Sequence, residues 1–339
     1  MKLRWGILGY GRIAKVFEES FLDSDNSKLF AIASNGKIIK PKLKNNTVQI
    51  YPSYEKLLED KNIDVVYIAN VNNLHKDTII KATNHKKNIL VEKPAFLNIN
   101  DFNECIGLVK KNNIFFMEAI MYLHHPQINK IAEIILNGEI GNIISVRANM
   151  GFNINKTFLG FIKKKGDENG RLLNKNLGGG AINDLGCYPV SAVNFISKLT
   201  NSKTLEIKNI KAKSLFSSTN VDVVSSAYIH FNNNIYSEFN IAITKNYKSI
   251  LEIVGEKGVL KIFNPWTPNK DYKINIKNNF FYSKTYNFNC EKSLYTYQID
   301  DVTANINKGN IETIGHGMKW SDTKVCTNIL EAWKIAINY

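Results

Sequence analysis

The chain has 339 residues, a length that suggests two domains or one domain with a large insertion. Hydrophobic residues make up 44% of it and charged residues 22%, values that argue against disorder, a collagen-like fibre and a coiled coil. No apolar run approaches the roughly 20 residues needed to span a bilayer, and the first residues lack the apolar segment of a signal peptide. We therefore expect a cytoplasmic protein.

The formal net charge of +14 raises the question of nucleic-acid binding. Of the 44 basic residues, only Arg4, Arg12, Arg147 and Arg171 are arginines, the residue that supplies a bidentate fork for bases and phosphates. The lysines are scattered and often lie beside asparagine, as in residues 44–46. We expect no nucleic-acid partner, whereas an anionic small ligand is compatible with this charge.

The residues that could bind metal or form disulfides are dispersed. The four cysteines form no CxxC pair, so we expect reduced and mostly buried thiols: Cys105, Cys187, Cys290 and Cys326. His124 and His125 are adjacent, but no third ligand clusters with them in the sequence. We therefore expect no metal site and assign these two histidines structural roles.

Strand and helix patterns alternate over residues 1–120. The predicted strands are Leu3–Leu8, Lys28–Ser34, Ile63–Ala69, Asn88–Glu92 and Ile114–Met117. The predicted helices are Arg12–Leu22, Tyr54–Glu59, Leu74–Asn84 and Asn100–Lys111. Ile63–Ala69 is β-branched and apolar enough for a sheet that is buried on both faces. The alternation predicts an α/β domain with a doubly wound parallel sheet.

Residues 121–339 have a different pattern. They begin and end with helices, predicted at Pro126–Asn137 and Asp322–Ile337. Between them we expect strands at Ile143–Met150, Leu205–Leu215, Val223–Phe231, Ile235–Ile243, Ser249–Val254 and Val259–Phe263. Several of these strands alternate polar and apolar residues, as a sheet with one solvated face should. We expect a second, α+β domain with a large, mostly antiparallel open sheet.

A glycine-containing turn directly follows the first predicted strand. Residues 8–14, Leu-Gly-Tyr-Gly-Arg-Ile-Ala, fit GxGxxA and open a helix, the context in which this pattern indicates a dinucleotide site. Gly9 permits the tight turn, Gly11 lets the backbone approach the pyrophosphate, and Ala14 allows close helix–strand packing. The helix N-terminus offers N–H groups to the phosphates. We expect the cofactor to contact Gly9, Tyr10, Gly11, Arg12 and Ile13.

The end of the second predicted strand bears on the choice between NAD and NADP. An Asp or Glu there would hold the ribose 2′-OH of NAD, but the chain has Ala-Ser-Asn-Gly-Lys at residues 33–37. Ser34, Asn35 and Lys37 could hold the 2′-phosphate of NADP, so we expect NADP to be preferred over NAD. The alternative is that Lys37 is one more solvated lysine in a lysine-rich chain.

Two segments carry candidate catalytic side chains. Glu92-Lys93-Pro94 ends the fourth predicted strand, and a lysine at the carboxyl end of a parallel strand points into the crevice where ligands bind. In the second segment, residues 177–189, three consecutive glycines let the backbone approach another group closely. Asp184 and Tyr188 are four residues apart and share one face if this segment is helical, although Pro189 could start or kink the helix.

These motifs, in this order, resemble the Gfo/Idh/MocA family of oxidoreductases, most closely its branch of dihydrodiol and D-xylose dehydrogenases and glucose–fructose oxidoreductase. The resemblance covers essentially the whole chain and also rests on residues 68–75, 118–122 and 255–258. It implies an NAD(P)-binding Rossmann domain followed by a mixed-sheet domain. In this family the open face of that sheet often mediates dimerisation, so we expect a homodimer or a dimer of dimers.

The resemblance also implies a reaction: reversible hydride transfer between a nicotinamide and a carbinol carbon of a sugar, cyclitol or diol. Lys93 matches the lysine that hydrogen-bonds the reacting oxygen, Tyr188 the acid/base tyrosine, and Asp184 an aspartate that binds substrate or supports the acid/base. The other residues that match cofactor-binding positions are Asn70, Asn72, His75 and Glu92. The residues in regions that line the substrate pocket of relatives are Tyr122, Phe152, Arg171 and Trp266.

A pairing of Lys93 with Tyr188 is also chemically reasonable. A phenol with a pKa near 10 is a poor base at neutral pH, and a nearby ammonium lowers that pKa by favouring the phenolate. Lys93 beside Tyr188 would supply this charge and would stabilise alkoxide character on the substrate. The chain departs from its relatives at Asn70-Val71, where Thr-Pro is common, and at Leu123, where arginine is frequent.

Three other activities remain open on this sequence. One is ketosugar reduction in nucleotide-sugar biosynthesis, which suits a basic chain and a preference for NADP. Another is a regulator that binds a dinucleotide without turnover, although such a sensor does not require Lys93 and Tyr188. The third is a glycosidase that uses bound NAD transiently.

Overall fold

The computed structural model describes residues 2–34, 40–43, 48–158, 162–164, 166–200, 204–278 and 283–339. The chain divides into two compact units. The first comprises Met1–His125 and Glu291–Thr323, and the second comprises Pro126–Cys290 and Lys324–Tyr339. The sequence pattern places every residue after 120 in a second domain, whereas the structure groups Glu291–Thr323 with the first unit.

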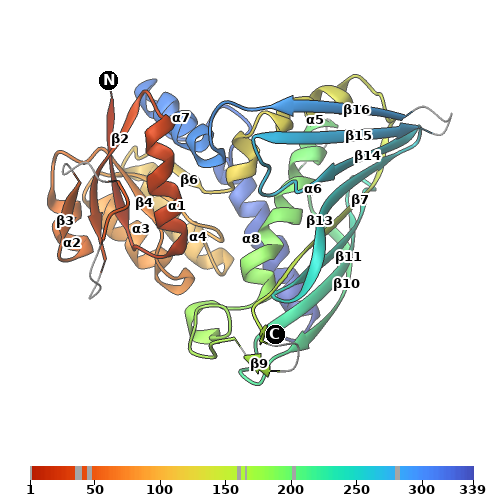
Figure 1. Cartoon of the computed structure of the whole chain (residues 1–339), viewed down its shortest axis with the longest axis horizontal. Coiled ribbons are helices and arrows are strands. Elements are labelled where there is room, and N and C mark those ends of the chain that lie inside the picture. Colours follow the sequence, from red (N-terminus) through yellow and green to blue (C-terminus); the bar gives the residue numbers. More distant parts are fainter. Residues whose placement is uncertain are drawn as a thin grey trace. The chain divides into compact units, whose positions relative to one another are not determined.

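The first unit is built on a six-stranded parallel sheet, drawn in red to yellow (Figure 1). Its strands are β1 (Leu3–Leu8), β2 (Ser27–Ala33), β3 (Gln49–Tyr51), β4 (Val65–Ile68), β5 (Asn88–Val91) and β6 (Phe116–Glu118). Their order is β3-β2-β1-β4-β5-β6, and every neighbouring pair is parallel. This is a doubly wound order, so the predicted class of the first domain is confirmed. The short edge strand β3 was not predicted.

Helices cover both faces of this sheet. They are α1 (Arg12–Glu19), α2 (Tyr54–Glu59), α3 (His75–Asn84), α4 (Ile99–Lys111) and α7 (Leu294–Asn307). On one face, α2, α3 and α4 contribute buried side chains such as Leu57 and Phe102 to a core shared with the strands. On the other face, Phe17 of α1 stacks on Tyr67 of β4 and also packs against Trp5 of β1.

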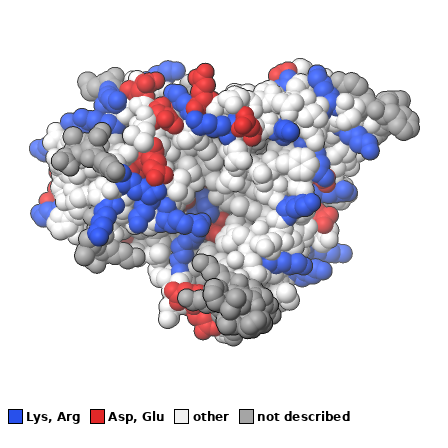
Figure 2. All heavy atoms as spheres, in the orientation of Figure 1, with Lys and Arg blue, Asp and Glu red and all other residues white. Residues whose placement is uncertain are grey.

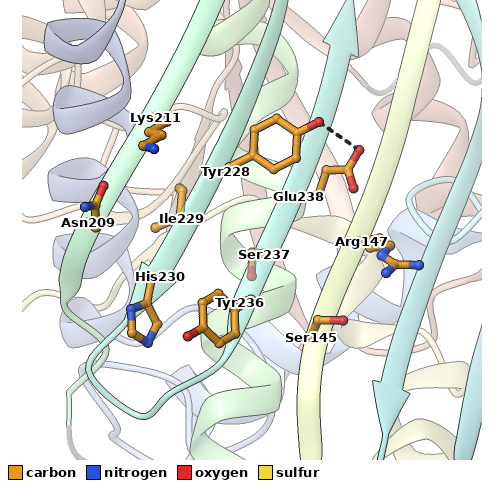
Figure 3. Close-up of a pocket in the computed structure, with 10 residues that line it drawn as sticks. All are labelled: Ser145, Arg147, Asn209, Lys211, Tyr228, Ile229, His230, Tyr236, Ser237 and Glu238. Atoms are coloured by element: carbon orange, nitrogen blue, oxygen red, sulfur yellow. Dashed lines mark hydrogen bonds between the residues drawn. The ribbon is translucent and has the colours of Figure 1, made fainter.

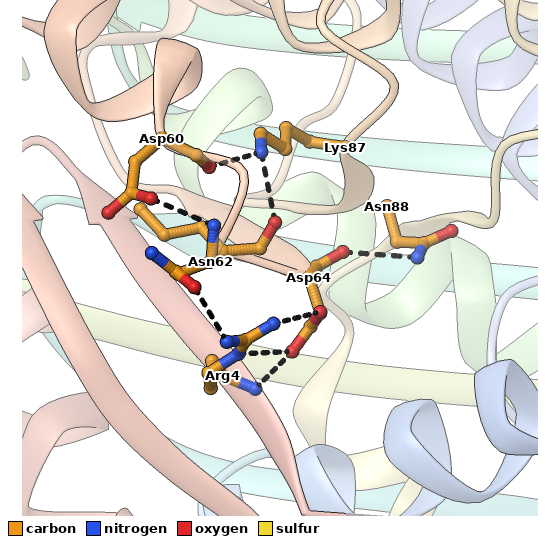
Figure 4. Close-up of polar contacts among 7 residues, drawn as sticks. Arg4, Asp60, Asn62, Asp64, Lys87 and Asn88 are labelled. Carbon is orange, nitrogen blue, oxygen red and sulfur yellow. Dashed lines mark hydrogen bonds and ion pairs between the residues drawn. The ribbon is translucent and has the colours of Figure 1, made fainter.

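A polar network joins the amino ends of β1, β4 and β5 (Figure 4). Arg4 donates from Nε and Nη2 to the Asp64 carboxylate, at 3.1 and 3.2 Å. The Asn88 amide donates to the Asp64 carbonyl at 3.1 Å. Lys87 is buried, and its Nζ donates to two backbone carbonyls, one of them that of Asp60 at 2.6 Å. This network holds the sheet edge opposite to the one where ligands bind in such folds.

Helix α7 returns from late in the sequence to pack on the first unit. The Ser27 and Thr303 hydroxyls are 2.6 Å apart and buried, and Ser24 donates to Asp300 at 2.7 Å. The sequence analysis did not predict this helix. Several of its buried side chains are polar, including Thr296 and Asn305, so the apolar periodicity that marks a helix is weak.

The second unit is built on an eight-stranded sheet. Its strands are β7 (Ile143–Asn153), β10 (Ile207–Phe216), β11 (Asp222–Phe231), β12 (Tyr236–Ala242), β13 (Thr244–Gly255), β14 (Gly258–Phe263), β15 (Asp271–Asn278) and β16 (Ser283–Asn289). Their order is β10-β11-β12-β7-β13-β14-β15-β16, and only the β12–β7 pair is parallel. The predicted mostly antiparallel sheet is confirmed. Strands β15 and β16 were not predicted, nor was the small hairpin of β8 (Lys156–Phe158) and β9 (Ile162–Lys164).

Helices α5 (Gln127–Leu136), α6 (Cys187–Leu199) and most of α8 (Trp320–Ala336), from Lys324 onward, complete this unit. Trp333 of α8 packs on Phe239 of β12, with ring centroids 5.9 Å apart. Elsewhere on the sheet, Tyr228 and Tyr236 are more than half exposed, which leaves an open face. Across the described ranges, no helix combines the length and the apolar character needed to cross a membrane.

The surface carries its positive charge in a dispersed form. Figure 2 shows Lys and Arg side chains spread over much of the visible face, with Asp and Glu side chains among them. This distribution agrees with the interpretation that most lysines are solvated surface residues. The four cysteines are buried and free, in agreement with the expected reduced thiols.

Candidate active site

Five loops meet at the carboxyl edge of the parallel sheet. Backbone hydrogen bonds continue the ladder just past the strand ends, from Gly9 N to Ala33 O at 2.9 Å and from Ala69 N to Leu8 O at 2.8 Å. Two more bonds, from the N–H groups of Glu92 and Ala119, align the ends of β4, β5 and β6 in the same way. Ligands of open α/β sheets bind at this edge, where the strand order reverses.

The turn between β1 and α1 requires glycine at one position and leaves space at another. Gly9 has φ +95°, and a Cβ there would lie 2.8 Å from the Ala69 carbonyl oxygen. Gly11 has φ −87° and no atom within 4 Å of the position of a Cβ. Gly9 is therefore needed for the turn itself, whereas at Gly11 the missing side chain leaves open space beside the backbone.

This space fits the dinucleotide that the sequence analysis expects. No side chain caps the N-terminus of α1, and no acidic residue occupies its first turn, so the positive end of the helix is not neutralised locally. Arg12 is exposed and Ile13 is half-buried in that turn. The Tyr10 hydroxyl bonds the buried Glu18 and the Lys40 carbonyl, and burial together with Glu18 raises the pKa of Tyr10 well above its usual range.

The residues that the sequence analysis assigns to the 2′-phosphate are only partly described. Ser34 is buried directly after β2. Asn35 and Lys37 lie outside the described residues. The expected preference for NADP therefore stays a prediction.

The loop after β4 and the start of α3 bring two asparagines and a histidine to the carboxyl edge of the sheet. The Asn70 amide donates to Thr78 Oγ1 at 2.8 Å, and Asn72 opens a short 3-10 turn, Asn72–Leu74. His75 is buried, with Nδ1 2.9 Å from the Pro94 carbonyl oxygen. A carbonyl only accepts, so Nδ1 carries the proton and Nε2 is left as an acceptor. Within the described part of the chain, Nε2 has no hydrogen-bond partner.

Burial also sets the charge of this histidine. It lowers the pKa of His75 to about 4, the Pro94 carbonyl opposes that change, and the positive charge of Lys93 adds to it. His75 is therefore neutral at physiological pH. A neutral imidazole with an unpaired Nε2 can accept a hydrogen bond from a hydroxyl group that reaches this buried atom.

Glu92 and Lys93 follow β5 directly. The Glu92 carboxylate accepts a hydrogen bond from the Tyr67 hydroxyl with one oxygen and from the Lys93 N–H, at 3.3 Å, with the other. Glu92 is buried, whereas Lys93 is half-buried. The strand end and the Glu92 contacts thus hold the lysine backbone at the carboxyl edge of the sheet.

A further carboxylate at this edge, Glu118 at the end of β6, was not among the predicted site residues. It is buried and accepts a hydrogen bond from Ala95 N at 3.0 Å. Burial raises the pKa of Glu118 to about 7, with Glu92 adding to the rise and Lys93 opposing it. The signal was present, because Glu118 ends a parallel strand as Glu92 nearly does and begins one of the segments that carry the resemblance.

The second unit carries the glycine-rich segment. Gly178 and Gly180 have φ +74° and +115°, and a Cβ on Gly179 would lie within 2.8 Å of three carbonyl oxygens in residues 171–174. The close approach expected from the three glycines is therefore to the chain's own backbone. The next residues form a π-helical turn, Ile182–Gly186, that runs into α6.

Two predicted site residues form an ion pair on this turn. Arg171 donates from Nη1 to Asp184 Oδ1 at 2.9 Å, and the side chains are 48% and 7% exposed. Pro189, in the first turn of α6, lacks the N–H that would close an α-helical bond to the Leu185 carbonyl. π-turns often occur at functional sites. The guanidinium thus neutralises a buried carboxylate while remaining accessible to a ligand.

Tyr188 lies at the second position of α6 and is buried. Its ring centroid is 5.9 Å from that of Trp266, which is fully buried. The structure thus brings together two pairs of predicted residues in this unit, Arg171 with Asp184 and Tyr188 with Trp266. Phe152 is half-buried in β7.

Tyr122 belongs to the first unit, in a buried 3-10 turn, Met121–His124. In the same turn, His124 Nδ1 lies 3.1 Å from Asp301 Oδ2. The neighbouring His125 is buried and packs near Tyr297. Over the ranges that the structure describes, no group of three or more His, Cys, Asp or Glu residues could hold a metal ion.

A pocket of about 290 Å³ lies on the second sheet, among side chains of β7, β10, β11 and β12 (Figure 3). The Tyr236 and His230 rings stack in it with centroids 4.3 Å apart. Tyr228 and Glu238 point toward one another across neighbouring strands. None of the predicted site residues lines this pocket.

Comparison with known protein families identifies the chain. A model described as the oxidoreductase family, NAD-binding Rossmann fold, matches residues 3–119, and the GFO/IDH/MocA C-terminal domain matches residues 128–261. The chain belongs to the GFO/IDH/MocA family. It is therefore an NAD(P)-dependent oxidoreductase, which confirms both the resemblance and the expected class of activity.

Relatives of this family member align over nearly its whole length. A trans-1,2-dihydrobenzene-1,2-diol dehydrogenase from Xenopus tropicalis is 28% identical over 98% of this chain and 97% of the relative. The Mus musculus protein of the same name is also 28% identical, over 99% and 97%.

Solved structures of low sequence identity share the fold. A 3-ketoreductase from Actinomadura kijaniata, in complex with NADP and TDP-benzene, has a TM-score of 0.83 at 21% identity, covering 99% of this chain and 98% of that one. An aldose-aldose oxidoreductase from Caulobacter crescentus, complexed with glycerol, has a TM-score of 0.82 at 20% identity, covering 100% and 98%.

Proposed function

We propose that this oxidoreductase acts on a secondary hydroxyl or keto carbon of a sugar, a sugar derivative or a cyclic diol. The observation that carries the proposal is the placement of Lys93 on the same sheet edge as the open turn at Gly9 and Gly11. When bound there, a nicotinamide dinucleotide supplies the hydride acceptor or donor. The names of the relatives, dehydrogenases of a cyclic diol, support the choice of substrate class.

In this proposal Tyr188 exchanges the proton of the reacting hydroxyl. A hydride leaves an alcohol carbon only if the hydroxyl proton is removed with it, so the chain must supply a base at that oxygen. Tyr188 is buried. Asp184, on the preceding helical turn, forms an ion pair with Arg171. Burial keeps bulk water away from the proton transfer.

Lys93 donates a hydrogen bond to the reacting oxygen in the same proposal. An ammonium favours negative charge on that oxygen and so lowers the barrier in both directions of the reaction. The neutral His75 accepts a hydrogen bond from a ribose or substrate hydroxyl through Nε2. Asp184 and Arg171 bind further hydroxyl groups, and the Tyr188–Trp266 pair offers an aromatic wall for the C–H face of a ring.

We propose that Gly9, Tyr10, Gly11, Arg12, Ile13, Asn70, Asn72 and Glu92 hold the dinucleotide. NADP is the proposed preference, because no acidic residue follows β2 to hold a 2′-OH and Ser34, Asn35 and Lys37 stand there instead. The support for this preference is the sequence of that loop.

We further propose that two copies of the chain associate through the open face of the second sheet, as a homodimer or dimer of dimers. Tyr228 and Tyr236 are more than half exposed there, as is Leu215. Exposed aromatic and aliphatic side chains on one face are typical of an interface. A cytoplasmic location is proposed as well, supported by four buried free thiols.

The test combines cofactor binding with turnover. Thermal unfolding is measured with NADPH and with NADH, and the expected result is a larger upward shift with NADPH. Initial rates are then measured with NADP⁺ and a panel of polyols and cyclic diols. Replacing Tyr188 by Phe or Lys93 by Met should lower kcat by about 10²–10⁴-fold, the usual size of an acid/base or charge contribution.

Matched controls separate chemistry from folding in this experiment. Tyr247→Phe, on strand β13, and Lys110→Met, on the exposed side of α4, remove the same chemical groups elsewhere and should leave kcat unchanged. Full activity in both Tyr188→Phe and Lys93→Met would contradict the proposed roles. Dinucleotide binding without turnover on any substrate would favour a regulator that only senses the dinucleotide.

A further inference from the structure

The segment that carries Asp184 and Tyr188 is held by a buried carboxylate from a distant strand. Asp222 is the first residue of β11 and is 1% exposed. Its Oδ2 accepts a hydrogen bond from Ile182 N at 2.8 Å, where the π-helical turn begins. The turn has no side-chain cap from its own N-cap residue, so this acceptor comes from 40 residues further along the chain.

The same carboxylate leaves no room for a side chain at position 180, just before the turn. Gly180 has φ +115°, and a Cβ on it would lie 2.2 Å from Asp222 Oδ1. No side chain could occupy that position while the carboxylate remains. The backbone N–H of Asp184 in turn bonds the Gly180 carbonyl at 2.9 Å. Asp222 thus bonds the first N–H of the turn, and Asp184 bonds the carbonyl of the glycine beside that carboxylate.

Other groups of the second unit complete the environment of Asp222. Burial raises the pKa of Asp222 to about 7, and the N–H groups of Ile182 and Ala181 and the charge of Lys334 oppose that rise. The Tyr339 hydroxyl donates to the Gly179 carbonyl at 3.3 Å, so the C-terminal residue also restrains the glycine segment. A buried acid is costly unless its oxygens are bonded, and backbone N–H groups provide those bonds here.

We propose that Asp222 is a positioning residue that sets the placement of Asp184 and Tyr188 by holding the first N–H of their helical turn. The inference rests on the proposed roles of those two residues in proton transfer and substrate binding. Asp222 itself does not touch the reacting atoms. Its effect reaches them through the Ile182 backbone and through Gly180.

The turn ends at Gly186, two residues before Tyr188, and Asp184 within it lies four residues before Tyr188, close to one helical turn. A rotation of the π-turn would therefore move the phenol hydroxyl relative to the reacting oxygen. Misplacement of an acid/base group by about 1 Å can cost about 10²-fold in rate. The expected effect is thus on kcat rather than on binding of the dinucleotide by the first unit.

The experiment compares three variants of the full-length protein. Asp222→Ala removes the acceptor, Asp222→Asn keeps one acceptor oxygen for Ile182 N, and Ile229→Ala removes a buried side chain from the same strand. We expect Asp222→Ala to lower kcat by about 10–100-fold with little change in dinucleotide affinity. Asp222→Asn should recover most of that loss. Ile229→Ala should lower the melting temperature and leave kcat intact.

Hydrogen exchange gives a readout that does not need turnover. Amides of residues 181–188 should exchange about tenfold or more faster in Asp222→Ala and stay protected in Ile229→Ala, because only the first variant frees the turn. If wild-type protein turns over but Asp222→Ala retains both kcat and amide protection, the positioning role is wrong and the proposed function stands. If Ile229→Ala loses as much kcat as Asp222→Ala, the effect is general destabilisation and the inference fails.

Failure of the proposed function has a different signature. In that case wild-type protein shows no turnover, or Tyr188→Phe is fully active, while exchange at residues 181–188 still reports whether Asp222 holds the turn. Loss of protection in Asp222→Ala would then support the structural part of the inference. Unchanged protection would overturn it regardless of activity.

Discussion

At the scale of single residues, the carboxyl edge of the parallel sheet collects buried titratable groups. Glu118 and His75 are both nearly inaccessible, and burial is the main cause that shifts each pKa toward the neutral form. The charge of Lys93 acts on both of them, lowering each pKa. His75 is therefore neutral near pH 7, whereas Glu118 is close to the midpoint of its titration there.

The raised pKa of Glu118 predicts a pH dependence of stability. In the folded protein this pKa is about 7, above its ordinary value of 4.5, so the native state holds a proton that the unfolded chain releases within this window. Protonation of Glu118 makes its full contribution to the free energy of unfolding below pH 4.5, and this contribution is lost as the pH rises through 7. Relative to Glu118→Gln, the wild type should lose on the order of 3 kcal/mol between pH 5 and 8.

Urea unfolding of both proteins at pH 5, 6, 7 and 8 measures this difference. Glu206→Gln, at an exposed loop position, serves as the control, and its unfolding free energy should follow that of the wild type at each pH. Asp222 contributes a trend of the same sign, but it is present in both proteins and cancels in the comparison. Parallel stability curves for wild type and Glu118→Gln would show that Glu118 does not titrate in this window.

At the scale of elements, the β1–α1 turn contains two glycines that lack a side chain for different reasons. At Gly9 the backbone lies at positive φ against the Ala69 carbonyl, so the residue serves the fold. At Gly11 the backbone angles suit any residue and no atom is near, so the missing side chain leaves free space where we propose that the dinucleotide binds. The same distinction applies in the second unit, where Gly180 accommodates Asp222.

These two glycines give a matched pair of variants. Gly11→Ala should keep the melting temperature of the free protein, because the methyl group meets nothing, but should weaken NADPH binding by about tenfold or more, or about 1.4 kcal/mol. Gly9→Ala should destabilise the free protein by at least about 1–2 kcal/mol, because its conformation is unfavourable for any residue with a Cβ. Thermal unfolding with and without NADPH separates the two effects. An unchanged NADPH shift in Gly11→Ala would place the cofactor elsewhere.

At the scale of the whole molecule, the first unit is built from two separate parts of the chain. Residues 291–323 return to it after the complete second sheet has been formed. The Ser27–Thr303 contact joins groups 276 residues apart in sequence, and Phe116 N bonds the Ile311 carbonyl at 3.1 Å. The first unit therefore depends on chain that follows the second sheet.

A double-mutant cycle on Ser27 and Thr303 measures how much their contact contributes to the free energy of unfolding. Ser27→Ala or Thr303→Val alone should each cost about 1–2 kcal/mol, because each leaves a buried hydroxyl without its partner. The double variant should cost less than the sum of the two, since no unpaired hydroxyl remains. Additive losses in urea unfolding would show that the two hydroxyls do not interact in solution.

The sequence predicted much of the local structure, and the reasons are visible in particular elements. Strand β1 and helix α2 have the predicted limits, because β1 is a short apolar run buried on both faces of the sheet and Ser53 caps α2 just before its buried leucines. Strand β15 was missed although Tyr272, Ile274 and Ile276 alternate with polar residues, so its signal was present in the sequence. Helix α7 was missed because buried polar side chains such as Thr296 and Asn305 weaken its apolar periodicity. The domain assignment of residues 291–323 could not be predicted, since it depends on contacts with residues such as Ser27.

For the candidate site, the sequence predicted which residues lie together on one local element. Gly9 and Gly11 belong to one short turn, and Glu92 and Lys93 directly follow one strand, so spacing along the chain was enough to place them together. Which groups are buried, and what they face, depends on the fold as a whole. The Arg171–Asp184 pair, the Glu118 carboxyl near neutrality and the Asp222 contact with Ile182 depend on burial and long-range approach. Desolvation and hydrogen bonding act through space, and no local pattern encodes them.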